Sequence, residues 1–442
     1  MDDTAGARTQ ITHRRVLNVA VPVVVSNATI PLLGLVDTGV VGQLGLAAPI
    51  GAVGIGAVIL TAIYWIFGFL RMGTSGLAAQ ALGAGDRAEV AALLTRGLMI
   101  GAIAGLAVIA FQVPLFQGAF VLSPASAEVE GLARGYMQVR VWGAPAVIGM
   151  FAITGWLIAQ ERTRAVLAIQ LMMNGANIGL DLWFVLGLEW GVVGIAWATL
   201  IAEWSGLALG LWLCRAAFRV PDWRDWPRVF DAVRLKRMAV VNSDILMRAL
   251  MIEGIFVSFL FWGADFGDAT LAANQVLLQL IHLTSHTMDG FAVAAETLVG
   301  QATGARQRAR LRRAAILSSG WALTICAGLS VVFLLFGSDL VALMAKSTDV
   351  QAAAALYLPF VVAVPVCACA AFMLDGIFIG ATRTRDMRNM MAVSLAIYLV
   401  VALVLMPLWG NSGLWVALLV SFVARGATLA YRYPALERSA QG

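Results

Sequence analysis

Apolar residues occur along this chain in long runs that are separated by short polar segments. A helix that crosses a bilayer needs about 20 consecutive, mostly apolar residues, and the sequence contains twelve such runs. We predict membrane-spanning helices near residues 16–38, 47–71, 92–114, 132–157, 165–187, 191–214, 240–263, 270–298, 314–336, 353–379, 389–408 and 413–432. Because the connections are short, the pattern predicts an all-α membrane protein without an extramembrane domain.

Two motifs of the first half return in the second half. QALGAGDR (80–87) returns as QATGARQR (301–308), and FAITGWLIAQERTR (151–164) returns as FMLDGIFIGATRTR (372–385). Both motifs return at the same offset, which is half of the 442 residues, so we expect two six-helix repeats around a central cavity. Such a duplicated bundle is typical of alternating-access transporters more than of membrane enzymes.

The repeat also predicts the domain boundaries. An amphipathic, charged segment lies at the middle of the chain and contains no predicted span. We therefore expect an N-lobe, a cytoplasmic linker between the lobes, and a C-lobe that ends in a short cytoplasmic tail. The predicted ranges are 1–214, 215–239 and 240–442, respectively.

Composition excludes several classes of protein. Hydrophobic residues make up 61% of the chain and charged residues only 12%, whereas soluble proteins contain about 25% charged residues. A cytosolic enzyme, a secreted disulfide scaffold and a disordered chain are all disfavoured. The four cysteines lie in apolar runs without the spacing of a zinc or redox site, so we expect no metal site.

The basic residues predict the orientation in the membrane. Most of the 30 Lys and Arg residues fall in the termini and in the loops after every second predicted span, whereas Arg134, Arg140 and Lys346 fall on the opposite side. By the positive-inside rule, both termini are expected in the cytoplasm of a multi-pass protein of the bacterial inner membrane. The net charge of +5 is spread over short loops, so no nucleic-acid partner is expected.

Asp37 is the first ionisable residue inside a predicted span. A buried carboxyl group loses water, which favours its neutral form, so Asp37 could bind and release a proton or hold a small cation. Pro22 precedes it in the same span and lets that helix bend, because proline removes a backbone hydrogen bond. The alternative is an aspartate at the outer end of the helix that is stabilised by water.

A second polar group lies on the fifth predicted span. Asn174, Asn177 and Asp181 are spaced by three, four and seven residues, so they share one helix face. Thr199 of the sixth span could add a hydroxyl group. This pattern favours an oxygen-rich cation pocket, and the alternative is a set of hydrogen bonds that joins the helices.

The second half carries acids of its own. Asp289 and Glu296 share a helix face, Met288 could line an adaptable apolar cavity, and Arg248 needs a counter-charge for which Asp244 and Glu253 are the expected partners. The acids within the predicted spans of this half are Glu253, Asp289, Glu296 and Asp375.

Taken together, these motifs resemble the multidrug and toxic compound extrusion (MATE) transporters of the DinF type, over essentially the whole chain. The resemblance rests on IPLLGLVDTGVVGQLG, the QALGAGDR and QATGAR endings, NSDILMRAL, TMDGFAVAAETLVGQATGAR and MLDGIFIGATRTRDMRN. It implies two lobes of six helices that alternate between inward-open and outward-open states and exchange ions for amphipathic, often cationic compounds. Asp37 matches the family's carboxylate of span 1, and Pro22 matches the bend before it.

The resemblance also implies roles for further residues. The polar cluster that completes the family's N-lobe cation site is matched by Asn177, Asp181 and Thr199. The sequence position of Tyr136 is close to that of a tyrosine in the family's N-lobe cavity. In the NorM branch, acids on spans 7 and 10 bind sodium, and Glu253 and Asp375 fall at roughly those places. We expect proton coupling at the N-lobe, with sodium as the alternative ion.

The expected function is therefore a secondary active multidrug exporter and not an enzyme. No nucleophile–base pair or metal triad is evident, and QALGAGDR lacks the GK[ST] ending of a nucleotide-binding loop. No cofactor is expected besides the coupling ion, and the expected partners are amphipathic small molecules and the lipid bilayer around a monomer. The alternatives are a sodium-coupled drug antiporter and a flippase for lipid-linked precursors, which would need a strongly cationic central cavity.

Overall fold

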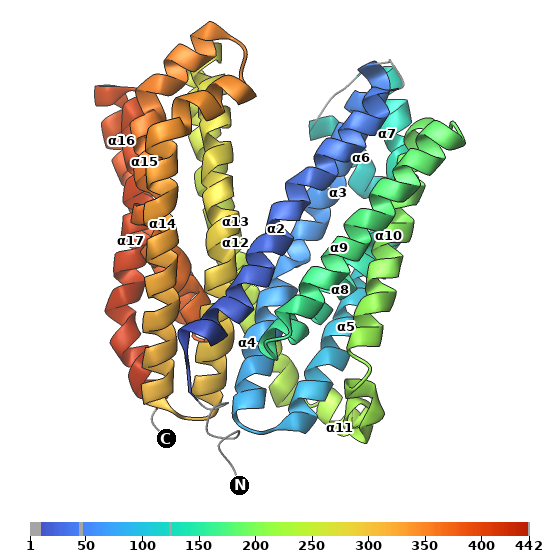
Figure 1. The fold of residues 1–442 in the computed structure, drawn as a ribbon, viewed down its shortest axis with the longest axis vertical. Coiled ribbons are helices and arrows are strands. Elements are labelled where there is room, and N and C mark those ends of the chain that lie inside the picture. Colours follow the sequence, from blue (N-terminus) through green and yellow to red (C-terminus); the bar gives the residue numbers. More distant parts are fainter. Residues whose placement is uncertain (1–9, 44–46, 123–125, 441–442) are drawn as a thin grey trace. The chain divides into compact units, whose positions relative to one another are not determined.

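The computed structural model describes residues 10–43, 47–122 and 126–440, and helices form all of the regular structure in these residues (Figure 1). By their contacts the described residues divide into two compact units. The first-half unit comprises Val25–Ala78 and Asp86–Arg237. The second-half unit comprises the described residues up to Val24, the segment Ala79–Gly85 and the residues from Met238 onward.

The helices of the first half are mostly long and apolar. Short 3-10 helices join α3 to α4 and α7 to α8, so each of these pairs runs as one nearly continuous helical rod. The helices are α2 (His13–Gly42), α3 (Ala47–Trp65), α4 (Phe69–Gly83), α5 (Arg87–Ala110), α6 (Gln112–Leu122), α7 (Ala127–Arg140), α8 (Ala144–Ala159), α9 (Thr163–Asp181), α10 (Gly191–Leu213) and α11 (Trp226–Val229).

The helices of the second half are longer. They are α12 (Ala232–Gly263), α13 (Asp268–Gly304), α14 (Arg308–Met344), α15 (Thr348–Gly380), α16 (Thr384–Trp409) and α17 (Asn411–Ser439). Internal prolines occur in α15, α16 and α17. The core of this unit is a cluster of apolar side chains around Phe259 and Trp415, whose rings meet edge to face at 4.9 Å.

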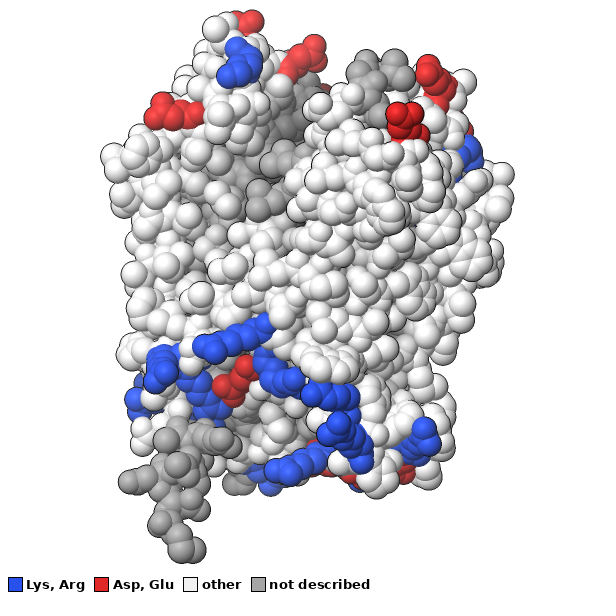
Figure 2. Space-filling model, turned by 45° about the vertical axis from the view of Figure 1, so that its right-hand side comes forward, with Lys and Arg blue, Asp and Glu red and all other residues white. Residues whose placement is uncertain are grey.

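Ten helical segments of the described chain are long and apolar enough to cross a membrane. They are Ala48–Gly83, Arg87–Ala110, Ala127–Ala159, Thr163–Gly187, Gly191–Leu213, Ala232–Phe266, Arg308–Met344, Thr348–Gly380, Thr384–Trp409 and Asn411–Ser439. The two remaining predicted spans coincide with α2 and α13. On the face drawn in Figure 2, charged side chains gather near the helix ends and the surface between these ends is uncharged, as a bilayer requires.

The internal repeat is visible in the helix ends. Helices α8 and α15 end at Ala159 and Gly380, and the following helices α9 and α16 begin at Thr163 and Thr384, so both pairs keep the offset of the sequence repeat. Both turns have the same backbone hydrogen bond, from the Arg162 amide to the Leu157 carbonyl and from the Arg383 amide to the Phe378 carbonyl, each at 2.9 Å. The repeated sequence therefore builds the same helix-ending turn twice.

The turns after α8 and α15, and likewise the turns after α4 and α13, have a left-handed backbone at matching positions. Glu161 and Thr382 have φ of 60° and 50°, and Gly85 and Arg306 have φ of 77° and 53°. The members of each pair are again separated by half the length of the chain. Only Gly85 has the residue type that adopts this conformation without strain, so the turn geometry is retained even where the side chain differs.

Two repeated glycines allow close backbone contact inside the second-half unit. A Cβ atom on Gly83 would lie 2.0 Å from the Gln301 carbonyl oxygen, and one on Gly304 would lie 1.9 Å from the Gln80 carbonyl oxygen. The contact is reciprocal, because the QALG and QATG motifs each supply one glycine and one glutamine. These positions exclude any side chain, so the end of α4 packs directly on the end of α13.

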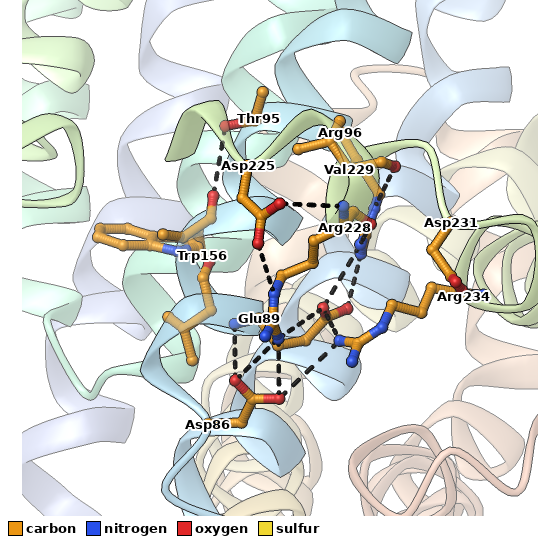
Figure 3. A network of polar contacts seen from close by, with 12 residues as sticks. Asp86, Glu89, Thr95, Arg96, Trp156, Asp225, Arg228, Val229, Asp231 and Arg234 are labelled. Atoms are coloured by element: carbon orange, nitrogen blue, oxygen red, sulfur yellow. Dashed lines mark hydrogen bonds and ion pairs between the residues drawn. The ribbon is translucent and has the colours of Figure 1, made fainter. Parts of the chain in front are cut away.

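The segment between the two predicted lobes is folded onto α5 (Figure 3). Arg96 of α5 is 2% exposed, forms an ion pair with Glu89 at 2.6 Å and donates a hydrogen bond from Nε to the Val229 carbonyl at 2.9 Å. Asp86 caps the N-terminus of α5 and forms an ion pair with Arg228 at 3.2 Å. Figure 3 labels further residues of this cluster, among them Thr95, Asp225, Asp231 and Arg234. This segment is thus an ordered part of the first-half unit.

Candidate functional site

The first-half unit brings Asp37 and Asp181 together. Asp37 is half-buried on α2, and Asp181 is fully buried at the last residue of α9. The two carboxyl groups interact electrostatically. Because two carboxylates that lie close together repel each other, a proton on one of them or a bound cation would relieve this repulsion. The α-helix changes into a π-helical turn, Leu182–Gly187, directly after Asp181, and such turns are frequent at functional sites.

The side-chain amides of α9 form hydrogen bonds to α2 and α10. Asn177 donates a hydrogen bond from Nδ2 to Thr199 Oγ1 at 3.2 Å, and the Thr199 hydroxyl donates to the Ile195 carbonyl at 3.0 Å. Asn174 donates from Nδ2 to the Thr29 carbonyl of α2 at 3.4 Å. The structure therefore brings α2, α9 and α10 together through the residues predicted from the sequence.

Oxygen atoms outnumber donors at this place. Among the described residues, four buried oxygen atoms have no hydrogen-bond partner: Asp37 Oδ1, Asn177 Oδ1 and both carboxyl oxygens of Asp181. An acceptor-rich cluster of this kind favours a proton or a small hard cation, because oxygen atoms are the ligands that such ions prefer.

A buried ion pair lies beside the carboxyl pair. Arg140, at the end of α7, donates from Nη2 to Glu203 of α10 at 2.5 Å and from Nη1 to the Tyr136 hydroxyl at 2.8 Å. The Tyr64 hydroxyl donates to the Arg140 carbonyl at 3.2 Å. The Arg140 guanidinium also interacts electrostatically with both Asp37 and Asp181.

Sequence reasoning misses this ion pair. The count of basic residues assigned Arg140 to the outer side, although the predicted span 132–157 includes it. In the structure it lies within the helical run Ala127–Ala159 with its side chain 11% exposed. Glu203 lies inside an apolar span and is not among the predicted site residues. The rule that each ionisable residue in a span is a functional candidate would have found Glu203. That Glu203 pairs with Arg140 could not be found in this way, because the two residues are 63 positions apart in the chain.

The acids of the second half do not form a comparable pocket. Glu253 is exposed on α12, whereas Asp375 of α15 is buried and forms ion pairs with Arg248 and with Arg425, the latter at 3.6 Å. The prediction that Arg248 pairs with Asp244 or Glu253 was therefore wrong, because its partner is Asp375. Asp244 instead pairs with Arg388 at 2.6 Å.

The remaining predicted residues of the second half lie on α13. Met288 is fully buried and accepts a hydrogen bond from the Cys326 thiol at 3.0 Å. Glu296 is also buried, and Asp289 is half-buried. Pro22, the predicted bend, is buried in α2, which continues as a helix through this residue.

Long apolar helices, an internal duplication and buried ionisable residues are typical of a membrane transporter. The family description MatE matches residues 22–183 and 245–408, and the chain belongs to this family, the MATE transporters, within its DinF-type branch. Its members are transporters and not enzymes.

Individual relatives cover almost the whole chain. DNA damage-inducible protein F of Escherichia coli (strain K12) is 36% identical over 425 residues, which cover 93% of this chain and 90% of the relative. A probable multidrug resistance protein NorM of Caulobacter vibrioides is 30% identical over 447 residues, with 93% and 89% covered. The prediction of the family is therefore confirmed.

Solved structures show the same fold. A MATE protein in the bent conformation superposes with a TM-score of 0.86 at 20% identity, covering 96% of each chain. The MATE transporter VcmN of Vibrio cholerae in the bent form superposes with a TM-score of 0.84 at 20% identity, covering 97% of this chain and 97% of that one.

Proposed function

We propose that this protein is a secondary active multidrug exporter that exchanges protons for amphipathic, cationic compounds by alternating access. In this proposal, residues 1–214 and 240–442 form two six-helix lobes around a central cavity, joined by 215–239. The protein acts as a monomer in the bacterial inner membrane, with both termini in the cytoplasm. The observation that carries the proposal is that Asp37 and Asp181 interact within a cluster of buried oxygen atoms that have no hydrogen-bond partner.

The coupling step follows from the charge of this pair. When neither carboxyl group carries a proton, the two carboxylates attract a cationic compound into the first-half site. A proton that enters from outside removes one negative charge, weakens this attraction and allows the compound to leave. One charge that crosses about 100 mV supplies about 2.3 kcal/mol for this cycle.

Helix α2 is the element that transmits the change. The boundary between the two compact units divides α2 at Val24 and Val25, only a few residues after Pro22. A helix bends most easily at proline. We infer that α2 bends near Pro22 when the charge on Asp37 changes.

The surroundings of the second-half acids are unsuited to sodium, which supports protons as the coupling ion. Asp375 is the buried acid that could bind sodium there, but Arg248 and Arg425 already surround it, so this cluster carries a net positive charge. A metal cation would be repelled by the two guanidinium groups. Glu253, the other acid of the sodium alternative, is exposed.

The deciding experiment is ethidium efflux from proteoliposomes under an imposed pH gradient, without sodium. We expect efflux from the wild type, loss of efflux in Asp37→Asn, and wild-type efflux in the control Glu128→Gln, which changes an exposed acid of α7. Wild-type efflux in Asp37→Asn would refute the role of this carboxyl group. Efflux that requires sodium would refute proton coupling and favour the sodium-coupled alternative.

A further inference from the structure

A basic groove opens at the surface of the second-half unit, between the first turns of α14 and the last turns of α17. One cavity, of about 560 Å³, is lined by Arg308, Arg312, Arg313, Ile316, Leu317 and Glu437, and we call it the mouth. A second cavity, of about 370 Å³, adjoins it and shares Arg312 and Ile316 with it. We call the two adjoining cavities the α14/α17 groove.

The mouth of the groove is positively charged. It is lined by three arginines and one acid. Glu437 Oε1 forms an ion pair with Arg308 Nε at 3.4 Å and lies 4.0 Å from Arg312 Nε. Arg313 forms no ion pair with any described residue, and the Arg312 side chain is 67% exposed. Arg308 is also the first residue of α14, a helix of 37 residues, whose N-terminus adds a partial positive charge. The mouth is thus suited to an anion.

The second cavity is mostly apolar. Besides Arg312 and Ser319, it is lined by Leu374, Ile377, Ala430 and Tyr433, and Ile316, which both cavities share, is 59% exposed. A free inorganic anion would leave this wall uncovered. A ligand that fits both parts has an anionic head and an apolar tail.

We propose that the α14/α17 groove binds an anionic phospholipid, with the phosphate at Arg312 and Arg313 and an acyl chain along Ile316 and Ile377. The arginines lie at the membrane side that the basic loops assign to the cytoplasm, where anionic lipids attract basic residues by about 1 kcal/mol each. Basic pockets between helices at this depth are suited to lipid headgroups. The inference does not depend on the transport mechanism proposed above.

The test is native mass spectrometry of the purified full-length protein, titrated with phosphatidylglycerol or phosphatidylethanolamine. The double variant Arg312→Gln/Arg313→Gln removes the charges at the mouth. The matched control Arg432→Gln/Arg438→Gln removes two exposed arginines of α17 that do not line the groove. We expect the first variant to bind phosphatidylglycerol roughly 30-fold more weakly and the control to bind as the wild type does.

Further measurements distinguish a phospholipid from a free phosphate compound as the ligand. Glycerol 3-phosphate, which has the headgroup without the acyl chains, should not displace the lipid, and Ile316→Ser should weaken lipid binding without affecting the charges. Thermal unfolding of each variant checks that it is folded. Equal losses in the two double variants, no preference over phosphatidylethanolamine, or displacement by glycerol 3-phosphate would each overturn the proposal.

Discussion

At the scale of single residues, the candidate site could be predicted as far as local spacing reaches. Asp37, Asn177 and Asp181 stand out because an acid or amide in an apolar helix is costly, and helical spacing places two of them on one face. The ion pairs could not be deduced in this way. Arg140 and Glu203 are 63 residues apart and Arg248 and Asp375 are 127 apart, so each pair depends on how the helices pack.

The Arg140–Glu203 pair yields a prediction about stability. Arg140→Gln leaves the Glu203 carboxylate buried without its counter-charge, so we expect a loss of about 3–5 kcal/mol, seen as a lower unfolding temperature in detergent. Arg140→Gln/Glu203→Gln should recover most of this loss, because the orphaned charge is removed as well.

The matched control is Arg134→Gln on the same helix. Arg134 pairs with Glu130 one turn away, and the two side chains are 37% and 32% exposed, so we expect a loss under about 1 kcal/mol. If Arg140→Gln and Arg134→Gln lowered the unfolding temperature equally, the buried pair would not be the stabilising element that the geometry indicates.

At the scale of elements, hydropathy predicted where helices lie but not where they end. The helix predicted at 240–263 begins earlier, at Ala232. Hydropathy did not detect its first turns, because they are polar. The predicted linker 215–239 likewise contains ordered turns and α11, which polar contacts with α5 stabilise. Hydropathy therefore predicts the part of a helix within the membrane, and hydrogen bonds determine the rest.

The reciprocal glycine contact can be tested with alanine. Gly83→Ala and Gly304→Ala each place a Cβ atom about 2 Å from a backbone carbonyl oxygen, which α4 and α13 can relieve only by separating. We expect each to lower stability by about 1–3 kcal/mol, measured by thermal unfolding. Gly320→Ala on α14 meets nothing within 4 Å and should be neutral or stabilising by up to about 1 kcal/mol. Equal effects at the three positions would contradict the close contact.

The contacts of Arg96 predict how the linker is anchored. Arg96→Ala removes the ion pair to Glu89 and the hydrogen bonds to the carbonyls of Arg228 and Val229. We expect a loss of about 3 kcal/mol and faster trypsin cleavage between residues 215 and 231. Arg87→Ala, at the start of the same helix, is the control and should leave the cleavage rate unchanged. Unchanged cleavage in Arg96→Ala would show that the linker is held by other contacts.

At the scale of the whole molecule, the chain repeats its scaffold but not its chemistry. Helix ends and turns recur after half the length of the chain, yet at this offset the position that matches Asp181 is Ala402, and the position that matches Arg425 is Trp204. The first half thus buries an acidic pocket and the second half a cluster with two arginines and one acid. The duplication could be predicted from the motifs, whereas this difference in charge became visible only when the partners of each residue were known.

The predicted orientation in the membrane can be tested with single cysteines at the two ends of α14. Gln307, before this helix, lies in an arginine-rich loop, and Ser347 follows its far end; both are exposed. By the positive-inside rule, the loop at Gln307 faces the cytoplasm. In intact cells, a membrane-impermeant maleimide should therefore label Ser347→Cys, and should label Gln307→Cys only after the cells are permeabilised. The wild type is the blank, since three of its four cysteines are buried. The reverse pattern would invert the topology, and labelling of both in intact cells would mean that α14 does not cross the membrane.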